Sequence, residues 1–202
     1  MSTSRNSRGD AEQDNGTRSG LELIGKLLRP VRAGRRHSRL APLTPALKIH
    51  VTSPAFMDGD TIPTKHAGKG VGDNISPALR WDGVPNNAAA LVLLLEDEDV
   101  PLPRPLIHTV AVLTTSADHI DEGALRPGSP GIRFIKTSLG CGYSGPRPLP
   151  GHGAHRYRFD LFAINRSVPS DVTTVRSLLN VMRGSVTARG ALTGSYRRPG
   201  DR

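Results

Sequence analysis

Four acidic residues in succession mark the first place where this sequence could do chemistry. Glu96, Asp97, Glu98 and Asp99 follow directly on the apolar run 91–95. Neighbouring carboxylates repel one another, so such a run is costly unless solvent or a ligand compensates the charge. Asp97 shares the alternation of the odd-numbered leucines in the run, so we expect its carboxylate to point inward at the rim of the core.

Imidazole, phenol and backbone amide groups are predicted to meet this carboxylate. His108 begins the next apolar segment and shares the alternation of Val110, while His155 and Tyr157 share one face of a later segment. The Gly/Pro-rich loop 142–148 supplies tight turns and exposed backbone N–H groups. All of these groups fall at segment ends or in loops, where binding groups gather.

Convergent N–H and O–H donors are what a phosphate or carboxylate ligand needs. We therefore expect a pocket for a small anionic or phosphorylated ligand, in which His108 and His155 donate to the anion and Tyr157 adds a hydroxyl. Asp97 is expected to orient the histidines and to keep them charged near neutral pH. The same residue types leave open an alternative, a hydrolase or isomerase that uses His and Asp as acid and base.

Three further patterns are typical of catalytic or cofactor sites but lack the features that those sites need. The glycine-rich stretch 68–72 has no preceding strand, following helix or Lys-Ser/Thr pair, which argues against a P-loop. Cys141 lies between two glycines, and nothing around it marks it as a nucleophile. His152 and His155 have the H-x-x-H spacing of zinc ligands, but neighbouring glycines disfavour the helix that would align them. We predict no catalytic residue, metal or cofactor.

The segments that position these groups are predicted mainly as strands. Short β-like runs alternate with Gly, Pro, Asn and Asp clusters, and the candidate strands are 47–53, 91–97, 107–114, 131–137, 156–165 and 191–197. The run 91–95 is apolar on both faces, which predicts burial between two layers. One late helix is expected, capped by Ser170 or Asp171 and terminated by Gly184. Many strands with one late helix indicate a mainly β sandwich or barrel.

Basic residues are concentrated at the N-terminus. The first 40 residues hold nine Lys or Arg and four Asp or Glu, in a chain of 202 residues with a net charge of +9. Residues 1–20 are polar without an apolar period and are expected to form a disordered basic tail. Residues 21–45 are expected to form a short amphipathic helix and a linker, and residues 46–198 the domain. We expect the apolar stripe of the helix to dock on the domain or on a second copy; weak contact with a membrane surface is the alternative.

Composition narrows the partners and the compartment. With four Phe, three Tyr and one Trp, the chain lacks the aromatic residues of a base-stacking surface, so we expect no specific nucleic-acid partner. A single cysteine fits a reducing compartment. No apolar run approaches the ~20 residues that cross a bilayer. We therefore expect a cytoplasmic protein.

An ordered set of motifs resembles the phosphatidylethanolamine-binding (Raf kinase inhibitor-like) family, in its bacterial branch. The run 74–85, NISPALRWDGVP, is similar to the family signature N-x-S-P-x-L-x-W-x-G-x-P. It is preceded by the entry-like motif FMDGDTIP at 56–63 and followed by DEDVP at 97–101, which is close to D-P-D-x-P. The set continues with His108, Gly-Tyr-x-Gly-Pro at 142–146 and His-Arg-Tyr at 155–157, and the resemblance covers about residues 47–197. Two positions depart from the family pattern, Glu98 in place of proline and Thr109 in place of an aromatic residue.

This resemblance implies a Greek-key antiparallel β-sandwich of the phosphatidylethanolamine-binding type, with a late C-terminal helix and a shallow anion pocket at one end. Carried over position by position, it places six residues around a ligand similar to a phospholipid headgroup: Asp97, His108, Gly145, Pro146, His155 and Tyr157. Thr109 is expected to open or soften the pocket wall. The resemblance further implies a binding protein that could modulate a protein target such as a kinase, and a homodimer.

Overall fold

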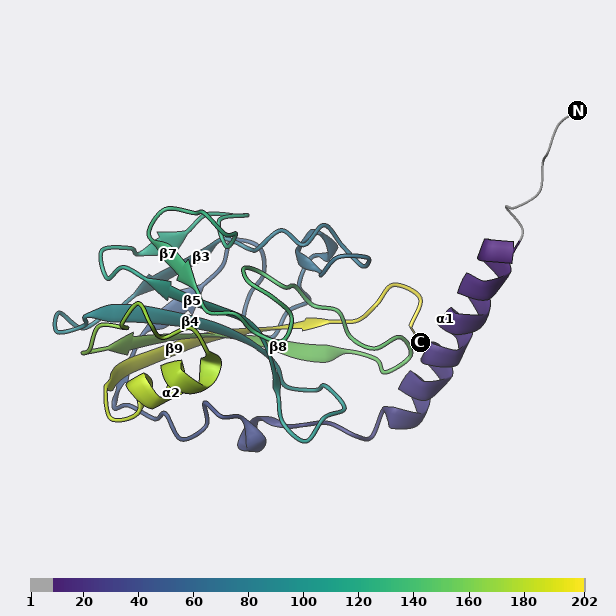
Figure 1. Cartoon of the computed structure of the whole chain (residues 1–202), viewed down its shortest axis with the longest axis horizontal. Coiled ribbons are helices and arrows are strands. Elements are labelled where there is room, and N and C mark those ends of the chain that lie inside the picture. Colours follow the sequence, from purple (N-terminus) through teal and green to yellow (C-terminus); the bar gives the residue numbers. More distant parts are fainter. Residues whose placement is uncertain (1–8, 202) are drawn as a thin grey trace, which may run out of the picture.

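The computed structural model describes residues 9–201 and is built mainly from two β-sheets (Figure 1). One sheet has six strands in the order β1-β9-β8-β4-β5-β7, and the other has three in the order β2-β3-β6. The strands are β1 (Leu47–Lys48), β2 (His50–Thr52), β3 (Leu79–Asp82), β4 (Ala90–Asp97), β5 (Leu106–Leu113), β6 (His119–Ile120), β7 (Ile132–Phe134), β8 (His155–Ile164) and β9 (Val186–Tyr196). The helices are α1 (Gly9–Leu28) and α2 (Val175–Met182), with short 3₁₀ turns at Arg35–His37 and Thr64–His66. The predicted mainly β fold is therefore confirmed.

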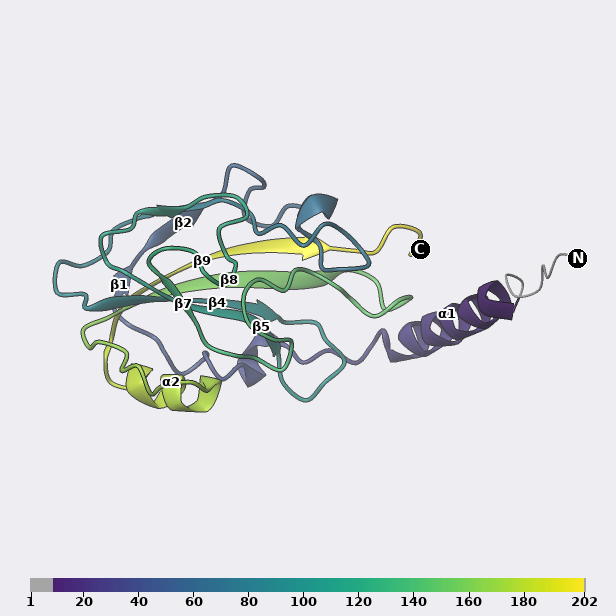
Figure 2. The same cartoon turned by 45° about the horizontal axis from the view of Figure 1, so that its top comes forward.

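Two buried clusters lie on opposite faces of the six-stranded sheet. The first joins Leu91 and Leu93 of β4 to Trp81 of β3 and fills the space between the two sheets. The second joins Val92 of β4 to Leu178 of α2. Figure 2 shows the resulting layers, with α2 on the side of the large sheet away from the small one. The expected burial of the run 91–95 on both faces is confirmed.

One strand pair departs from the antiparallel arrangement that the sequence predicted. β1 pairs with β9 in parallel, whereas the other pairs between the described strands are antiparallel. The predicted strand 47–53 divides at Ile49, because β1 joins the large sheet and β2 joins the small one. No strand is predicted from the sequence at β3 or β6, because both are short and take their register from neighbours distant in the chain. The Greek-key order of the strands stays a prediction.

Helix α2 begins later than the sequence predicted. Its N-cap is Thr174, whose hydroxyl accepts the N–H of Ser177 while the Ser177 side chain accepts the N–H of Thr174. This reciprocal pair satisfies two otherwise unpaired groups, so it replaces Ser170 and Asp171, the predicted caps. Gly184, with a φ of 73°, follows the helix as expected.

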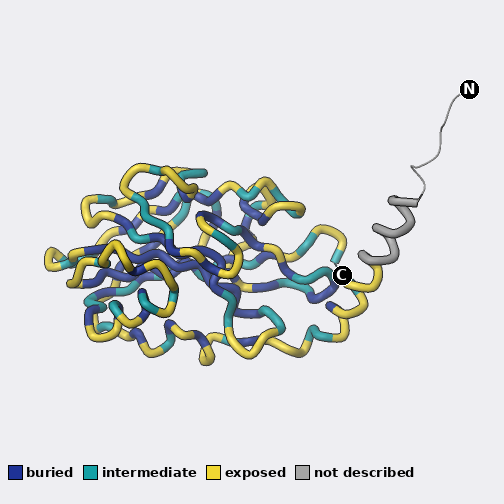
Figure 3. The backbone as a smooth tube through the Cα atoms, viewed as in Figure 1, coloured by how far each residue is buried: buried dark blue, intermediate teal, exposed yellow. Residues whose placement is uncertain are grey.

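Helix α1 extends away from the sheets, as Figure 3 shows for its described end. It begins at Gly9, so residues 9–20, predicted as a disordered tail, are helical; residues 1–8 of that tail lie outside the described residues. No proline interrupts 9–20, and the acidic residues near its start favour a helix N-terminus. Neither described helix has the length and apolar character that crossing a bilayer requires.

A glycine, rather than the apolar stripe, attaches α1 to the domain. A β-carbon at Gly25 would collide with the backbone carbonyl of Pro150, so only glycine allows this approach. Leu23 is 69% exposed and Leu27 80% exposed. The domain therefore leaves most of the apolar stripe uncovered, contrary to one of the two docking modes expected from the sequence.

Candidate functional site

A β-bulge brings His108 to the same side of the large sheet as Asp97. The pairing of β4 with β5 shifts register between residues 95 and 96, and His108 is the extra residue on β5. Bulges redirect side chains in this way. The predicted alternation with Val110 is therefore broken, because Val110 packs in the cluster beneath α2. The His108 ring instead lies 5.4 Å from the ring of Tyr157, which pairs with Asp97 in the sheet.

Asp97 and His155 form a buried pair across β4 and β8. The Nδ1 atom of His155 lies 2.8 Å from Oδ2 and 3.0 Å from Oδ1 of Asp97. The same Oδ1 accepts the backbone N–H of Asp99 at 2.9 Å. These contacts fix the carboxylate, so Asp97 orients His155. The ring of His108, also expected to be oriented by Asp97, is held instead by the carbonyl of Ser144.

His152 continues this pair toward the N-terminal helix. Its Nδ1 lies 2.6 Å from Nε2 of His155, and its Nε2 lies 2.8 Å from the carbonyl oxygen of Leu28 and 3.2 Å from that of Val31. Carbonyl oxygens only accept, so His152 carries a proton on Nε2. One proton must also lie between the two rings, and another between His155 and Asp97.

The two rings together therefore hold three ring protons and one positive charge. That charge balances the carboxylate of Asp97. Burial, together with the charge of His155, lowers the pKa of His152. The carboxylate of Asp97 contacts His155 and not His152, so the geometry places the positive charge on the ring beside it. The floor of the site is thus an ion pair that is neutral overall.

Tyr157 separates the two histidines that face the site. Its ring meets that of His108 edge-on and lies stacked 6.3 Å from that of His155. Its hydroxyl accepts the backbone N–H of Arg147 at 3.2 Å. Burial, and then the charge of Asp97, raises the pKa of Tyr157 well above its usual value, so the hydroxyl keeps its proton.

Asn74 and Thr109 hold the loop that borders the site. The side chain of Asn74 accepts the N–H of Gly145 at 2.9 Å and donates to the carbonyl of Tyr143 at 3.0 Å. Thr109 accepts the N–H of Ser144 at 3.1 Å. Thr109 was expected to soften the wall of the pocket; the structure shows it bound to the loop. The N–H groups at 144 and 145, which the sequence offered as ligand donors, are used within the protein.

Close backbone approach explains the glycine and proline of this loop. A β-carbon at Gly145 would collide with the carbonyl of His66. The carbonyl of Pro146 accepts the N–H of Gly68 at 2.8 Å. The loop therefore packs against residues 66–68, and that contact fixes its position beside the site.

The other members of the acidic run find partners within the protein. Asp99 accepts from Nε and Nη2 of Arg156 at 2.8 and 2.9 Å. Burial alone would raise the pKa of Asp99, but the hydrogen bonds from Arg156 bring it below its usual value. Glu96 points to the opposite face, where Ser38 donates to it at 2.7 Å and burial raises its pKa to about 7. Glu98 lies 3.7 Å from Nη1 of Arg156, while one buried oxygen of Glu96 and one of Glu98 have no hydrogen-bond partner among the described residues. Most of the charge of the run is therefore compensated within the protein.

A cavity of about 700 Å³ opens over this cluster. Its floor carries Asp97, His108 and His155, and its walls carry Arg147 and Arg198. Apolar residues form the rest of its rim, among them Leu21, Val100, Leu102, Leu106, Leu139 and Leu149. Helix α1 thus contributes to the cavity through the end that Gly25 anchors.

His108, rather than His155, is the histidine that can meet a ligand. Both ring nitrogens of His155 have partners within the protein, so this arrangement leaves it no free donor for an anion. Nδ1 of His108 donates to the carbonyl of Ser144 at 3.0 Å, the backbone of Gly145 also acts as an acceptor beside the ring, and none of the hydrogen bonds between described side chains and backbone groups ends on Nε2. Burial lowers the pKa of His108, and in the neutral ring this Nε2 accepts a hydrogen bond. The cationic groups that line the cavity are those of Arg147 and Arg198.

Three of the six predicted site residues line the cavity: Asp97, His108 and His155. The other three, Gly145, Pro146 and Tyr157, support the lining through the contacts described above. Sequence reasoning missed four further residues, His152, Asn74, Arg147 and Arg198. The H-x-x-H spacing of His152 and His155 is compatible with metal ligation, which is the one interpretation that the sequence suggests. The same spacing is equally compatible with two histidine rings that hydrogen-bond to each other, as the structure shows. Asn74 stood within the signature-like run without an assigned role.

Comparison with known proteins agrees with the fold and the motifs. The family model described as phosphatidylethanolamine-binding protein matches residues 52–197. The UPF0098 protein of Methanothermobacter thermautotrophicus is 34% identical over 158 residues, covering 75% of this chain and 98% of that protein. The UPF0098 protein of Chlamydia muridarum is 33% identical over 154 residues, covering 73% and 98%.

Solved structures show the same relationship. A putative phosphatidylethanolamine-binding protein homologue from Chlamydia trachomatis is 30% identical, with a TM-score of 0.67 over 76% of this chain and 100% of that one. YbcL from E. coli is 23% identical, with a TM-score of 0.68 over 75% and 99% of the two chains, and shows likeness of fold. Because the family model spans well over half of its length and these relatives match it along nearly their whole length, this chain belongs to the phosphatidylethanolamine-binding protein family.

Proposed function

We propose that this protein binds a small molecule carrying a phosphate or carboxylate group, similar to a phospholipid headgroup, in the cavity over Asp97 and His108. The observation that carries the proposal is the unpartnered Nε2 of His108 in a cavity whose walls hold Arg147 and Arg198. Two guanidinium groups supply the charge that an anion needs. The protein acts by binding, and modulation of a target such as a kinase would follow from it.

The charge of the floor supports entry of an anion. Asp97 would repel a negative ligand if its carboxylate were unpaired, but the adjacent His155 neutralises it. A singly protonated phosphate can donate its O–H to Nε2 of neutral His108, and a dianion would draw a proton onto the ring instead. Binding of the dianion is therefore accompanied by proton uptake. The apolar rim suits a ligand whose remaining part is less polar.

Titration of the full chain with phosphoethanolamine, inorganic phosphate and acetate tests this proposal. We expect saturable changes in the ¹⁵N signals of His108, with an affinity that falls at least about tenfold in Arg147→Gln and in His108→Gln. His119→Gln, in an exposed histidine of the small sheet, is the matched control and should bind as the unmodified protein does. Calorimetry in buffers of different ionisation enthalpy should show proton uptake with phosphate.

Two outcomes would contradict the proposal. One is the absence of saturable change at millimolar ligand; the other is unaltered affinity in both cavity variants. Turnover of a phosphate ester that disappears in His108→Gln would support the acid–base alternative, since His108 offers the free ring nitrogen. Thermal unfolding of each variant separates loss of binding from loss of fold.

We also propose that the exposed stripe of α1 mediates homodimer formation, with weak contact to a membrane surface as the alternative. The stripe includes Leu23 and Leu27, which the domain leaves exposed. Light scattering of the full chain should give a dimer mass that falls to the monomer mass in Leu23→Glu/Leu27→Glu. Equal masses would remove the stripe from any interface.

We further propose a cytoplasmic location, which the exposed free thiol of Cys141 supports.

A further inference from the structure

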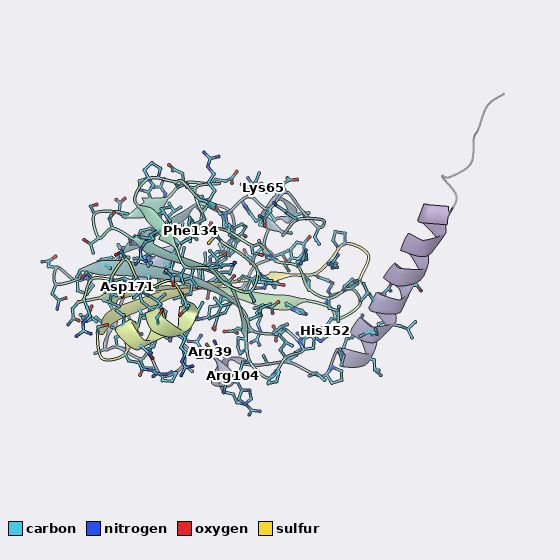
Figure 4. The ribbon with its side chains drawn as sticks, in the orientation of Figure 1. Arg39, Lys65, Arg104, Phe134, His152 and Asp171 are labelled. Atoms are coloured by element: carbon cyan, nitrogen blue, oxygen red, sulfur yellow. The ribbon has the colours of Figure 1, made fainter. Side chains whose placement is uncertain are left out.

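A second cavity, of about 940 Å³, lies beside α2 and shares no lining residue with the cavity over Asp97. Three separate segments form it: residues 37–43, the loop that carries Arg104, and the outer face of α2 with the turn after it. Figure 4 shows Arg39 and Arg104 near each other below this helix. The cavity is therefore a product of tertiary structure and not of one charged stretch.

Four arginines and one histidine line this cavity without a carboxylate among them: Arg39, Arg104, Arg176, Arg183 and His37. None of these arginines forms an ion pair with a described residue. The protein pairs other arginines closely, since Arg158 and Arg189 both contact the buried carboxylate of Asp160. Guanidinium groups that line one cavity without a counter-charge repel one another, weakly where water screens them, and a bound anion relieves that repulsion.

The four arginine side chains are exposed, and it is the backbone segments carrying them that are ordered. Arg176 and Asn180 lie one turn apart on the exposed face of α2, and Arg183, the C-cap of that helix, donates to the side chain of Asn180 at 3.2 Å. The opposite face of α2 is buried in the core. Arg39 lies between two anchored residues, because Ser38 is bound to Glu96 and Leu40 is fully buried. The cavity is thus formed from ordered segments before any ligand enters.

We propose that this cavity is a second binding site, which takes a small molecule carrying two or more phosphate groups. Guanidinium groups bind phosphate through paired N–H donors, and four of them suit more than one phosphate. The volume falls within the range of small-molecule pockets, about 300–1,000 Å³. No Phe, Tyr or Trp lines the cavity, so it offers no platform for stacking a nucleobase. A compact polyanion therefore fits better than a nucleic acid strand.

Calorimetric titration of the full chain with inorganic pyrophosphate, at ~0.15 M salt to screen diffuse attraction, tests the proposal. We expect saturable binding at one site, at least about tenfold tighter for pyrophosphate than for inorganic phosphate. The double variant Arg104→Gln/Arg176→Gln should weaken pyrophosphate binding by about tenfold or more. The control Arg80→Gln/Arg197→Gln removes the same charge from exposed positions outside the cavity and should bind pyrophosphate normally.

Three results would overturn the proposal. The first is no saturable pyrophosphate binding at millimolar concentration. The second is equal loss in the two double variants, which would indicate attraction by net charge alone. The third is that His108→Gln loses pyrophosphate binding while Arg104→Gln/Arg176→Gln retains it, which would place the anion over Asp97. Tight binding of duplex DNA by a protein that does not bind pyrophosphate would also overturn the proposal. Phosphoethanolamine titration of the Arg104→Gln/Arg176→Gln variant reports separately on the other cavity.

Discussion

Nδ1 of His152 lies 2.6 Å from Nε2 of His155, and this contact joins the cavity over Asp97 to the end of helix α1. On one side His155 pairs with Asp97 on the cavity floor. On the other side His152 donates to the carbonyls of Leu28 and Val31, in the region where a helix leaves its last carbonyl groups unpaired. The order of the N-terminal arm and the geometry of the floor are therefore coupled.

Replacing His152 by Phe should uncouple the order of the N-terminal arm from the geometry of the cavity floor. Buried Nε2 of His155 loses its acceptor, and the carbonyl of Leu28 keeps only the N–H of Val31 as a donor, so we expect the free energy of unfolding to fall by about 1–3 kcal/mol. Hydrogen exchange of the amides of Val31, Arg32 and Ala33 should accelerate. His119→Phe is the control, because His119 is exposed. A ¹⁵N spectrum of the unmodified protein in which His152 is protonated on Nδ1 alone would contradict the assigned pattern.

Two glycines of α1 should respond in opposite ways to the same substitution. Gly20 has no atom within 4 Å of the place where a β-carbon would stand, so Gly20→Ala should stabilise the helix by about 0.5–1 kcal/mol. Gly25→Ala should separate α1 from the loop at Pro150, because its β-carbon would collide there. Limited proteolysis near residues 29–33 measures the difference. Equal protection in both variants would show that Gly25 does not make the attachment.

Glu96 should make stability depend on pH. Its pKa is raised from 4.5 to about 7, chiefly by burial, so between these values the folded chain binds more protons than the unfolded chain. The free energy of unfolding therefore falls as the pH rises through this window. Glu96→Gln should raise it by about 3 kcal/mol at pH ~8 and leave it nearly unchanged at pH ~4.

Thermal unfolding at the two pH values measures the effect of Glu96→Gln, with exposed Asp171→Asn as the control. A stabilisation of equal size at both pH values would show that titration of Glu96 is not its source.

Asn74 should prove essential for the wall of the ligand cavity. Asn74→Asp keeps the acceptor for Gly145 and loses the donor to Tyr143, whereas Asn74→Ala loses both and forces alanine to a φ of 57°. We expect losses of about 1 kcal/mol and about 3 kcal/mol in unfolding free energy, respectively. Denaturant unfolding gives the values, and phosphoethanolamine affinity should fall in the same order. Equal stability of the two variants would mean that the contact with Gly145 contributes little.

Local sequence patterns were sufficient to predict the buried central strand, the direction of Asp97 and the family. The alternation within 91–97 placed Asp97 on the side of the core between the sheets, and the apolar character of both faces predicted a strand buried between layers. The ordered motifs from 56 to 157 identified the family. Each of these inferences depends on neighbours within a few positions, where side-chain direction follows directly from backbone period.

The tertiary structure decided how the site works. A one-residue bulge turned His108 toward Tyr157, and the spacing along β5 had indicated the opposite face. His152, and not a ligand, occupies the second nitrogen of His155, because a loop and the end of α1 meet there. Arg198 reaches the cavity from a distant part of the chain. Register shifts and contacts between distant segments leave no periodic trace in a sequence, so the residue types were predictable while their partners were not.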